Sequence, residues 1–421
     1  MNVLVLGNGF DLNYSLPTKY INFLHTLEYL STAEIGCIKT VADVFKSPKL
    51  HAQDKDIQIS YEKYAQEYSA VLLNKDTVAK LSDLARNNLW LKYFLQSLCQ
   101  DIGWIDFEKE ISTVLSCFRD FLQNADIKYD AVKLPVSAID KYILSKFNFF
   151  SKKAGRNSLP PALYIFNDEY TVSYPYGSDN KIIDVEKIIN ELELHLIALS
   201  DGLKIYLCCF VDQVVRELMK ANKLEKLLMF HGTNQVISFN YTNTYETVYG
   251  QNNVYHIHGN VDASIILGVN PDDSDEGSSI DTTFLRFKKY YQRVALGTDA
   301  EYLRWLQEIK ESHNHPGYDP ISLLVMGHSL DVTDSDIIVE LFELASDITV
   351  LYYNDSSKAS LIRNLVAIFG KNKFYQLRTQ KQLIFMPQSS DFSDFAKRKA
   401  ETSKHPLERY AETLEYFNKQ F

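Results

Sequence analysis

Two polar residues, Asn240 in SFNYTN and His258 in YHIHGN, are the clearest candidates for chemistry in this chain. Cleavage of an N-glycosidic bond passes through an oxocarbenium-like transition state, which requires an amide that orients the ribose or a water, and a base near the developing charge. An asparagine and a histidine supply those two groups. His256 would lie on the same strand face as His258, so a metal pair is an alternative. Because no cysteine, third histidine or paired carboxylate lies close in the sequence, we expect no metal.

A glycine-containing segment near the N-terminus is the candidate for binding a nucleotide. Gly7, Asn8, Gly9 and Asp11 directly follow an aliphatic run. A G-x-G turn lets the backbone approach a pyrophosphate without a Cβ in the way. The third glycine of the usual dinucleotide fingerprint is missing, because Leu12 stands there, and an ordinary strand-to-loop turn is an equally good interpretation.

These residues follow short apolar runs that alternate with helical patterns. The strands that we expect are 3–6, 235–239, 254–257, 265–269, 321–326, 348–353 and 383–386. Such runs, separated by helix-length segments, predict an α/β fold with a doubly wound, Rossmann-like parallel sheet. A helix is expected from Pro17 and Thr18 to about Leu30, which leaves Asp11 to Ser15 as a loop that could fold over a ligand.

The chain divides by pattern into four parts. Residues 1–30 give the first strand, glycine loop and helix, 31–224 a large, mostly helical insertion, 225–390 the remaining sheet, and 391–421 a charged C-terminal helical element. Within the insertion, Trp104 to Glu108 begins a helix whose acidic residues suit the first turn, and Asp106 or Glu108 could instead lie at the mouth of a nucleotide cleft. The segment from Tyr164 to Tyr176 predicts a strand or hairpin.

In an open parallel sheet the ligand lies outside the carboxyl ends of the strands, where the strand order reverses. This rule selects the polar residues at the predicted strand ends, namely Gly7, Asn8, Gly9, Asp11, Asn240, Thr242, His258, Gly327, His328, Ser329 and Asp331. Asn354 and Asp355 are expected to complete the site by holding an adenosine ribose. Each of these residues, taken singly, could also be a plain turn residue.

Composition limits the classes of function. A net charge of -10 argues against a dedicated nucleic-acid binder, since duplex binding depends on Lys and Arg meeting phosphates. The five cysteines are scattered and lack C-x-x-C spacing, which indicates thiols in a reducing compartment. No signal peptide is recognised, and no apolar run approaches the ~18 to 20 residues of a membrane span. We therefore expect a soluble, cytoplasmic protein.

Several short blocks together resemble a known family. LGNGFDLNYSLPTKY, SFNYTNTYE, YHIHGN, ILGVN and MGHSLDVTDSDI resemble the AbiH-like abortive-infection proteins of bacteria, relatives of the sirtuin-like NAD-binding fold. The resemblance implies a role in phage defence and a site like that of sirtuin-like NAD hydrolases. In that site Gly7 and Gly9 match the glycine-rich loop, Asn240 matches the Asn of a T-N-Y-D-like block, and His258 matches a His that precedes a Gly. Thr242 stands where those hydrolases often have Asp, and Asp11 where their loop usually offers Ser.

Three functions follow as hypotheses. The first is an antiphage effector that binds NAD, as substrate or ligand, and hydrolyses its nicotinamide bond, with Asn240 and His258 as the catalytic pair. The second is a module that senses a nucleotide without turnover, and the third, weaker, is a metal-dependent nuclease. Expected partners are a nucleotide, a phage-derived trigger and a second copy of the chain, with no membrane and no nucleic acid.

Overall fold

The computed structural model describes residues 1–46, 55–98, 107–124, 143–153, 163–173, 181–227, 230, 232–269, 282–313, 320–380 and 382–388. Its centre is a six-stranded sheet in the order β10-β9-β8-β1-β6-β7. The strands are β1 (Asn2–Leu6), β6 (Gln235–Ser238), β7 (Val254–His256), β8 (Ile321–Met326), β9 (Ala345–Tyr352) and β10 (Leu383–Pro387). The C-terminal element predicted at 391–421 and the residues 104–106 lie outside the described residues.

Every pairing in this sheet is parallel, and β1 lies between β6 and β8. Strands buried on both faces need apolar side chains at consecutive positions, and Val3, Leu4, Val5 and Leu6 are at most 2% exposed. Counted along the chain, the six strands have the order 3-2-1-4-5-6 of a doubly wound sheet, and the order reverses between β1 and β8. The predicted Rossmann-like α/β fold is confirmed.

One predicted strand is wrong. Residues 265–269 form no strand, and only an isolated bridge joins Val269 to Lys288. The backbone groups of this segment are satisfied elsewhere, because Ile266 N donates to His258 O at 2.9 Å and the hydroxyl of Tyr241 donates to Ile266 O at 2.8 Å. The segment therefore folds back on the end of β7 instead of extending the sheet.

The loop predicted at Asp11 to Ser15 is also wrong. A short helix, α1 (Gly9–Asn13), begins directly after the glycines. Phe10 is 1% exposed and packs edge-on against Tyr14, which anchors the helix in the core. Ser15, with φ +56°, then redirects the chain toward α2 (Tyr20–Thr32).

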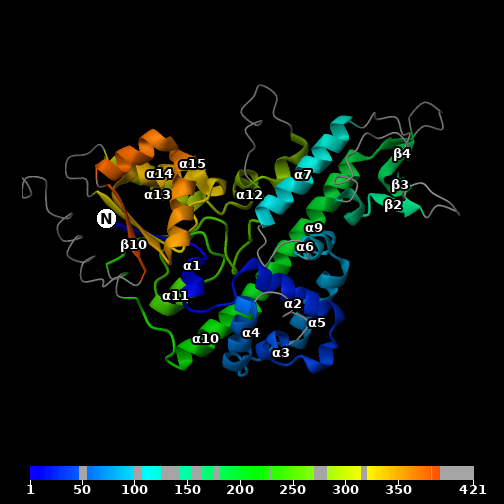
Figure 1. The fold of residues 1–421 in the computed structure, drawn as a ribbon, viewed down its shortest axis with the longest axis horizontal. Helices are drawn as coiled ribbons and strands as arrows, with labels where there is room; N and C mark the ends of the chain where they lie inside the picture. The colour runs from blue at the N-terminus through cyan, green and yellow to red at the C-terminus, as the bar shows by residue number, and fades with distance from the viewer. Residues whose placement is uncertain are drawn as a thin grey trace, which may run out of the picture.

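The segment between α2 and β6 is mostly helical and forms a second lobe beside the sheet, joined to the apolar cluster on one of its faces (Figure 1). Leu4 and Leu6 of β1 belong to the same apolar cluster as residues from its helices, whereas Val3 and Val5 face the second cluster on the other side. Its described elements are η1 (Ile35–Cys37), α3 (Val41–Phe45), α4 (Lys55–Glu67), α5 (Lys75–Asn87), α6 (Leu89–Leu98), α7 (Phe107–Asn124), β2 (Phe150–Lys153), β3 (Leu163–Phe166), η3 (Asp168–Tyr170), β4 (Thr171–Ser173), β5 (Lys181–Ile183), α9 (Val185–Tyr206), η4 (Leu207–Val211) and α10 (Asp212–Lys220). The strand or hairpin predicted between Tyr164 and Tyr176 corresponds to β3 and β4, which pair with β2 and β5 and not with each other.

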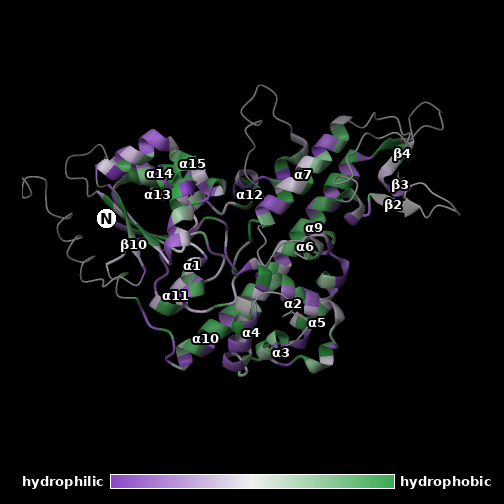
Figure 2. Ribbon diagram, in the orientation of Figure 1, coloured by the Kyte–Doolittle hydropathy of each residue, from purple (hydrophilic) through white to green (hydrophobic). Residues whose placement is uncertain are grey.

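The opposite face of the sheet is covered by helices from the second half of the chain. Those helices are α13 (Ala300–His313), α14 (Ser335–Leu344) and α15 (Asp355–Thr379), whose buried apolar residues belong to the second cluster. The remaining elements are α11 (Thr244–Tyr249), η7 (Thr282–Phe287), α12 (Lys289–Leu296) and η8 (Val332–Asp334), and the buried apolar residues of α11 and η7 belong to the first cluster. Hydrophilic residues colour much of the outer surface near α14 and α15 (Figure 2), which is the amphipathic pattern of helices that cover a sheet.

One continuous helix corrects an expectation from the sequence. Among the described residues, Val185–Lys220, which joins α9, η4 and α10 over 36 residues, is long and apolar enough to cross a membrane by length and composition alone. Ile188, Leu192, Leu199 and Phe210 on this helix are buried in the core. The helix thus serves as a core helix, which fits a soluble protein.

Candidate functional site

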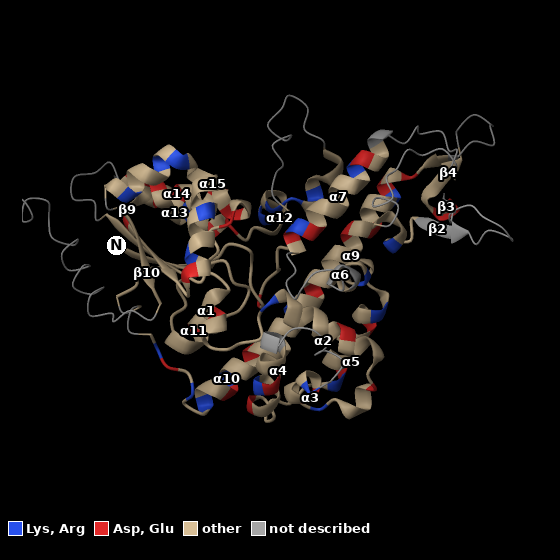
Figure 3. Cartoon of the chain, viewed as in Figure 1, with Lys and Arg blue, Asp and Glu red and all other residues tan. Residues whose placement is uncertain are grey.

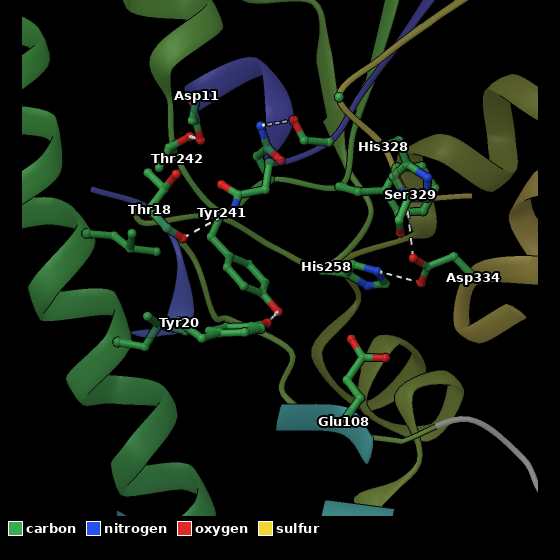
Figure 4. Close-up of a pocket in the computed structure, with 17 residues that line it drawn as sticks. Asp11, Thr18, Tyr20, Glu108, Tyr241, Thr242, His258, His328, Ser329 and Asp334 are labelled. Carbon is green, nitrogen blue, oxygen red and sulfur yellow. Dashed lines mark hydrogen bonds and ion pairs between the residues drawn. The ribbon is translucent and has the colours of Figure 1, made fainter. Parts of the chain in front are cut away.

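A cavity of about 240 Å³ opens at the carboxyl ends of β1 and β8, where the strand order reverses. This is the position at which open α/β sheets bind ligands. Its walls are formed by Gly7, Asn8, Asp11, Thr18, Tyr20, Glu108, Leu203, Leu207, Phe239, Asn240, Tyr241, Thr242, His258, Gly327, His328, Ser329 and Asp334. Figure 4 shows Asp11 and Thr242 on one side and His258, His328 and Asp334 on the other, with Tyr241 between them.

The glycines bring two turns into direct backbone contact. A Cβ on Gly7 would lie 2.4 Å from His328 Cα, and one on Gly327, whose φ is +72°, would lie 2.3 Å from Phe10 N. The amide of Gly9 donates to Gly327 O at 2.8 Å. Side chains at these positions would push the turns apart, so the glycines are required by packing whether or not a phosphate binds.

On one side of the cavity, Asp11 is 1% exposed and its Oδ2 accepts a hydrogen bond of 2.7 Å from the Thr242 hydroxyl. Its Oδ1 is buried and has no partner within the described part of the chain. Burial raises the pKa of Asp11 to about 6, and the Thr242 hydrogen bond offsets only part of that rise. Asp11 is therefore a carboxyl group that holds its proton unusually well.

Asn240 follows β6 and is fixed through its backbone and its amide. Its Nδ2 donates to Gly7 O at 3.0 Å, and its backbone carbonyl lies 2.9 Å from His256 Nδ1. The other ring nitrogen of His256 lies 2.6 Å from Glu246 Oε1. His256 thus supports Asn240 from behind, while His258 lines the cavity.

On the opposite side, His258 forms a buried pair with Asp334. His258 Nε2 lies 2.9 Å from Asp334 Oδ1, and its Nδ1 has no partner among the described residues. Phe239 packs against the rings of both His258 and His328, at centroid distances of 5.5 and 4.1 Å. Because a carboxylate can only accept, Nε2 carries the hydrogen and Nδ1 is left as the basic nitrogen.

Three groups converge on Asp334 and hold its negative charge. Besides His258, Lys289 Nζ lies 3.0 Å from Oδ1 and His328 Nε2 lies 3.3 Å from Oδ2. Burial by itself would raise the pKa of Asp334, but Lys289 and His258 outweigh it and hold that pKa well below its usual range. Burial and Lys289 lower the pKa of His258, so its neutral, basic form prevails at pH 7.

Comparison with protein families decides what this chain is related to. The model of the family described as bacteriophage abortive infection AbiH matches residues 3–353, which run from β1 into the end of β9. The chain belongs to the AbiH family. The AbiH match includes both sides of the cavity and the helices inserted between β1 and β6. A comparison with curated proteins returned no match, and one with solved structures returned none either.

Most of the site residues predicted from this AbiH sequence lie in the cavity wall. They are Gly7, Asn8, Asp11, Asn240, Thr242, His258, Gly327, His328 and Ser329. Gly9 is not in the wall, and neither are Asp331, Asn354 and Asp355. Asp331 accepts from Thr333 N at the start of η8, and Asn354 accepts from Ser357 N as the N-cap of α15. These two side chains cap helices and do not line the cavity.

Sequence reasoning missed Asp334, Lys289 and the aromatic wall of the AbiH cavity. Asp334 lies only three residues after the selected Asp331, and the short helix η8 turns it back toward His258. Tyr20 and Tyr241, whose hydroxyls lie 3.4 Å apart, come from distant parts of the chain. A second acidic residue in DVTDSD was the one available signal, whereas no sequence feature indicates the approach of Lys289.

The side chains of the cavity wall limit which ligands the AbiH site can bind. None of the described wall residues is a Lys or Arg. Within the described ranges, no group of three or more His, Cys, Asp or Glu side chains has the arrangement of a metal site. The wall offers a base, a carboxyl group, amides, hydroxyls and aromatic rings, which are groups that bind a sugar and a planar ring.

Proposed function

We propose that this AbiH protein binds NAD or a related nucleotide in the cavity and hydrolyses the N-glycosidic bond to nicotinamide in response to phage infection. The observation that carries the proposal is the buried pair of His258 and Asp334 in the cavity wall, in which the second ring nitrogen of His258, Nδ1, has no hydrogen-bond partner among the described residues. A neutral histidine oriented by a carboxylate is a competent general base. The resemblance of Gly7, Asn240 and His258 to sirtuin-like NAD hydrolases supports the same chemistry.

In this proposal a water molecule gives a proton to Nδ1 of His258 as its oxygen bonds to C1′ of the ribose. The bond between C1′ and the nicotinamide nitrogen breaks, and nicotinamide leaves with the bonding electrons. The Asp334 carboxylate stabilises the imidazolium that forms, since it accepts the hydrogen bond from Nε2. The products are nicotinamide, ADP-ribose and one proton.

Asn240 and Asp11 are proposed to position the ribose. The amide nitrogen of Asn240 donates to Gly7 O, and this hydrogen bond fixes the orientation of the side-chain amide. The amide oxygen, Oδ1 of Asn240, is then left to orient a ribose hydroxyl or the attacking water. The buried Oδ1 of Asp11 accepts from a ribose hydroxyl, so that the oxygen gains the partner it lacks. Thr242, which stands where the sirtuin-like hydrolases often have Asp, holds Asp11 in place.

The size and charge of the cavity support binding of one half of the dinucleotide. Its volume of about 240 Å³ is below the ~300 to 1,000 Å³ of pockets that enclose a drug-sized ligand. A wall without Lys or Arg among the described residues also suits a ribose and ring better than a pyrophosphate. The proposal therefore places the nicotinamide and its ribose inside, and the phosphates and adenosine outside.

The experiment that tests this function is incubation of the purified chain with NAD, with nicotinamide and ADP-ribose followed by chromatography. It is run with and without a phage-infected lysate, which supplies a possible trigger. His258→Ala is expected to lower nicotinamide release by about 10²- to 10⁴-fold, because the general base is lost. His195→Ala is the matched control, since this partly buried histidine on α9 does not line the cavity, and it is expected to leave release unchanged.

Two results would contradict hydrolysis. Release that falls only a few-fold in a folded His258→Ala variant would remove His258 from the chemistry. An absence of release with or without lysate, while NAD still protects the chain against heat, would favour the alternative of a nucleotide sensor. Activity that appears only with a divalent metal and on nucleic acid would favour a nuclease.

A further inference from the structure

A buried lysine connects the helical insertion to the base of the proposed reaction. Lys289, at the start of α12, is 1% exposed. Its Nζ lies 3.0 Å from Asp334 Oδ1 and 2.8 Å from Glu108 Oε1, in the first turn of α7. Figure 3 shows the basic residues of α12 beside the end of α7 nearest the sheet. A row of four groups thus runs from Glu108 through Lys289 and Asp334 to His258.

This arrangement locks a positive charge inside the protein. An ammonium group out of water is costly unless it is paired and hydrogen-bonded. Burial lowers the pKa of Lys289, but Asp334 and Glu108 outweigh burial and raise that pKa above its ordinary value. Lys289 is therefore positively charged at pH 7.

The positive charge of Lys289 lowers the pKa of His258, whereas the negative charge of Asp334 raises it. A histidine paired with a carboxylate alone holds a proton more tightly, and a protonated histidine cannot accept another. The charged and titratable groups around His258 are Asp334 from η8, Lys289 and Arg293 from α12, His328 at the end of β8, and Glu108 from α7. Of these, Lys289 is the cation that contacts the same carboxylate oxygen as His258.

We propose that Lys289 is a positioning residue that fixes Asp334 against His258 and keeps His258 in its neutral form, and that Glu108 makes this state depend on the helical insertion. Without Lys289 the carboxylate would still orient the ring, but it would also favour the imidazolium. The consequence for turnover rests on the function proposed above, whereas the charge state of His258 does not.

The test measures the protonation of His258 directly, without NAD. Histidine-labelled full-length protein is titrated by NMR, and the His258 signal is identified as the one missing in His258→Ala. In Lys289→Met the pKa of His258 is expected to rise by about one unit or more, because Asp334 is no longer offset. Loss of packing at position 289 would lower stability but would not by itself move this pKa upward.

A second variant keeps the test decisive where Lys289→Met folds poorly. Glu108→Gln removes the negative charge on the far side of Lys289, whose side chain then acts on Asp334 alone, so the pKa of His258 should stay the same or fall. Arg286→Met is the control, because Arg286 precedes α12 by three residues but pairs with Glu193 on α9 at 2.7 Å. It should leave the pKa of His258 unchanged.

The outcomes separate this inference from the proposed function. A rise of the His258 pKa in Lys289→Met, with no rise in Glu108→Gln, supports the inference even where NAD is not hydrolysed. An unchanged His258 pKa in Lys289→Met, or a rise in both variants, overturns it even where NAD is hydrolysed. In an active protein, Lys289→Met should also move the acid limb of the pH-rate profile upward by the same amount as the NMR pKa.

Discussion

Two buried aspartates face the same cavity and have opposite properties. Asp11 is 1% exposed, has only the neutral hydroxyls of Thr242 and Thr244 as hydrogen-bonding side chains that lower its pKa, and has a pKa raised by burial to about 6. Asp334 is 7% exposed, is contacted by a lysine and two histidines, and has a pKa held well below its usual range. Burial is nearly equal at the two positions, so the partners decide the charge.

The difference gives the two sides of the cavity separate roles. Asp334 remains an anion and can stabilise positive charge on His258 throughout a reaction. Asp11 can carry a proton near neutral pH and can therefore donate as well as accept a hydrogen bond. Carboxyl groups driven apart in pKa within one site are typical of sites that divide the work of acid and base.

The largest expected effect comes from removing the charge of Asp334. Asp334→Asn keeps the shape but leaves Lys289 with Glu108 as its remaining anionic partner among the described residues. Breaking a buried ion pair from one side costs about 3 kcal/mol in the free energy of unfolding. Urea unfolding at pH 7 measures this, and a loss below about 1 kcal/mol would show that Asp334 is not held as an ion.

Asp11→Asn should change the free energy of unfolding in the opposite direction from Asp334→Asn. Burial raises the pKa of Asp11 from its ordinary 3.8 to about 6, so between these pH values the folded chain keeps a proton that the unfolded chain has lost. The wild type therefore loses stability as the pH rises through this window, by up to about 3 kcal/mol for two pKa units. The variant carries no such proton. Compared with wild type, it should gain up to that amount at pH 8 relative to pH 3.5, and a difference that is constant with pH would contradict the raised pKa.

The smallest loss of stability is expected for a substitution at Asn354, which does not line the cavity. Asn354 was predicted to hold an adenosine ribose, but its side chain caps α15 by accepting from Ser357 N at 2.8 Å. Asn354→Ala should lower the free energy of unfolding by about 1 kcal/mol, as loss of an N-cap does. Heat protection by NAD should be unchanged, measured as the shift in melting temperature, and a loss of protection would extend the ligand site to β9.

The strands of the sheet could be predicted because parallel strands buried on both faces have consecutive aliphatic side chains, as in 3–6 and 321–326. The same signal failed at 265–269, where Ile265, Ile266 and Leu267 are buried under helices and side chains instead of in the sheet. A short apolar run indicates burial, and it does not say which partner covers it. The helix α1 was missed because five residues are too few for a helical period.

The site residues that could be predicted are those that directly follow a strand of the parallel sheet. Gly7, Asn240, His258 and Gly327 follow strands, and parallel strands bring their carboxyl ends to one edge. Lys289 and Glu108 come from helices, where only the packed structure brings them together. The pKa of His258 therefore depends on residues that no strand-end rule selects.

The central position of β1 has a consequence for how the chain is made. Asn2 and Met1 are hydrogen-bonded to Asn234 and Pro320, which lie 232 and 319 residues further along the chain. At roughly 5 to 20 residues per second, the ribosome needs on the order of tens of seconds to deliver β6 and β8 after β1 has emerged. During that interval the strands that pair with both edges of β1 are absent, so we expect this aliphatic segment to be prone to aggregation until nearly the whole sheet has been synthesised.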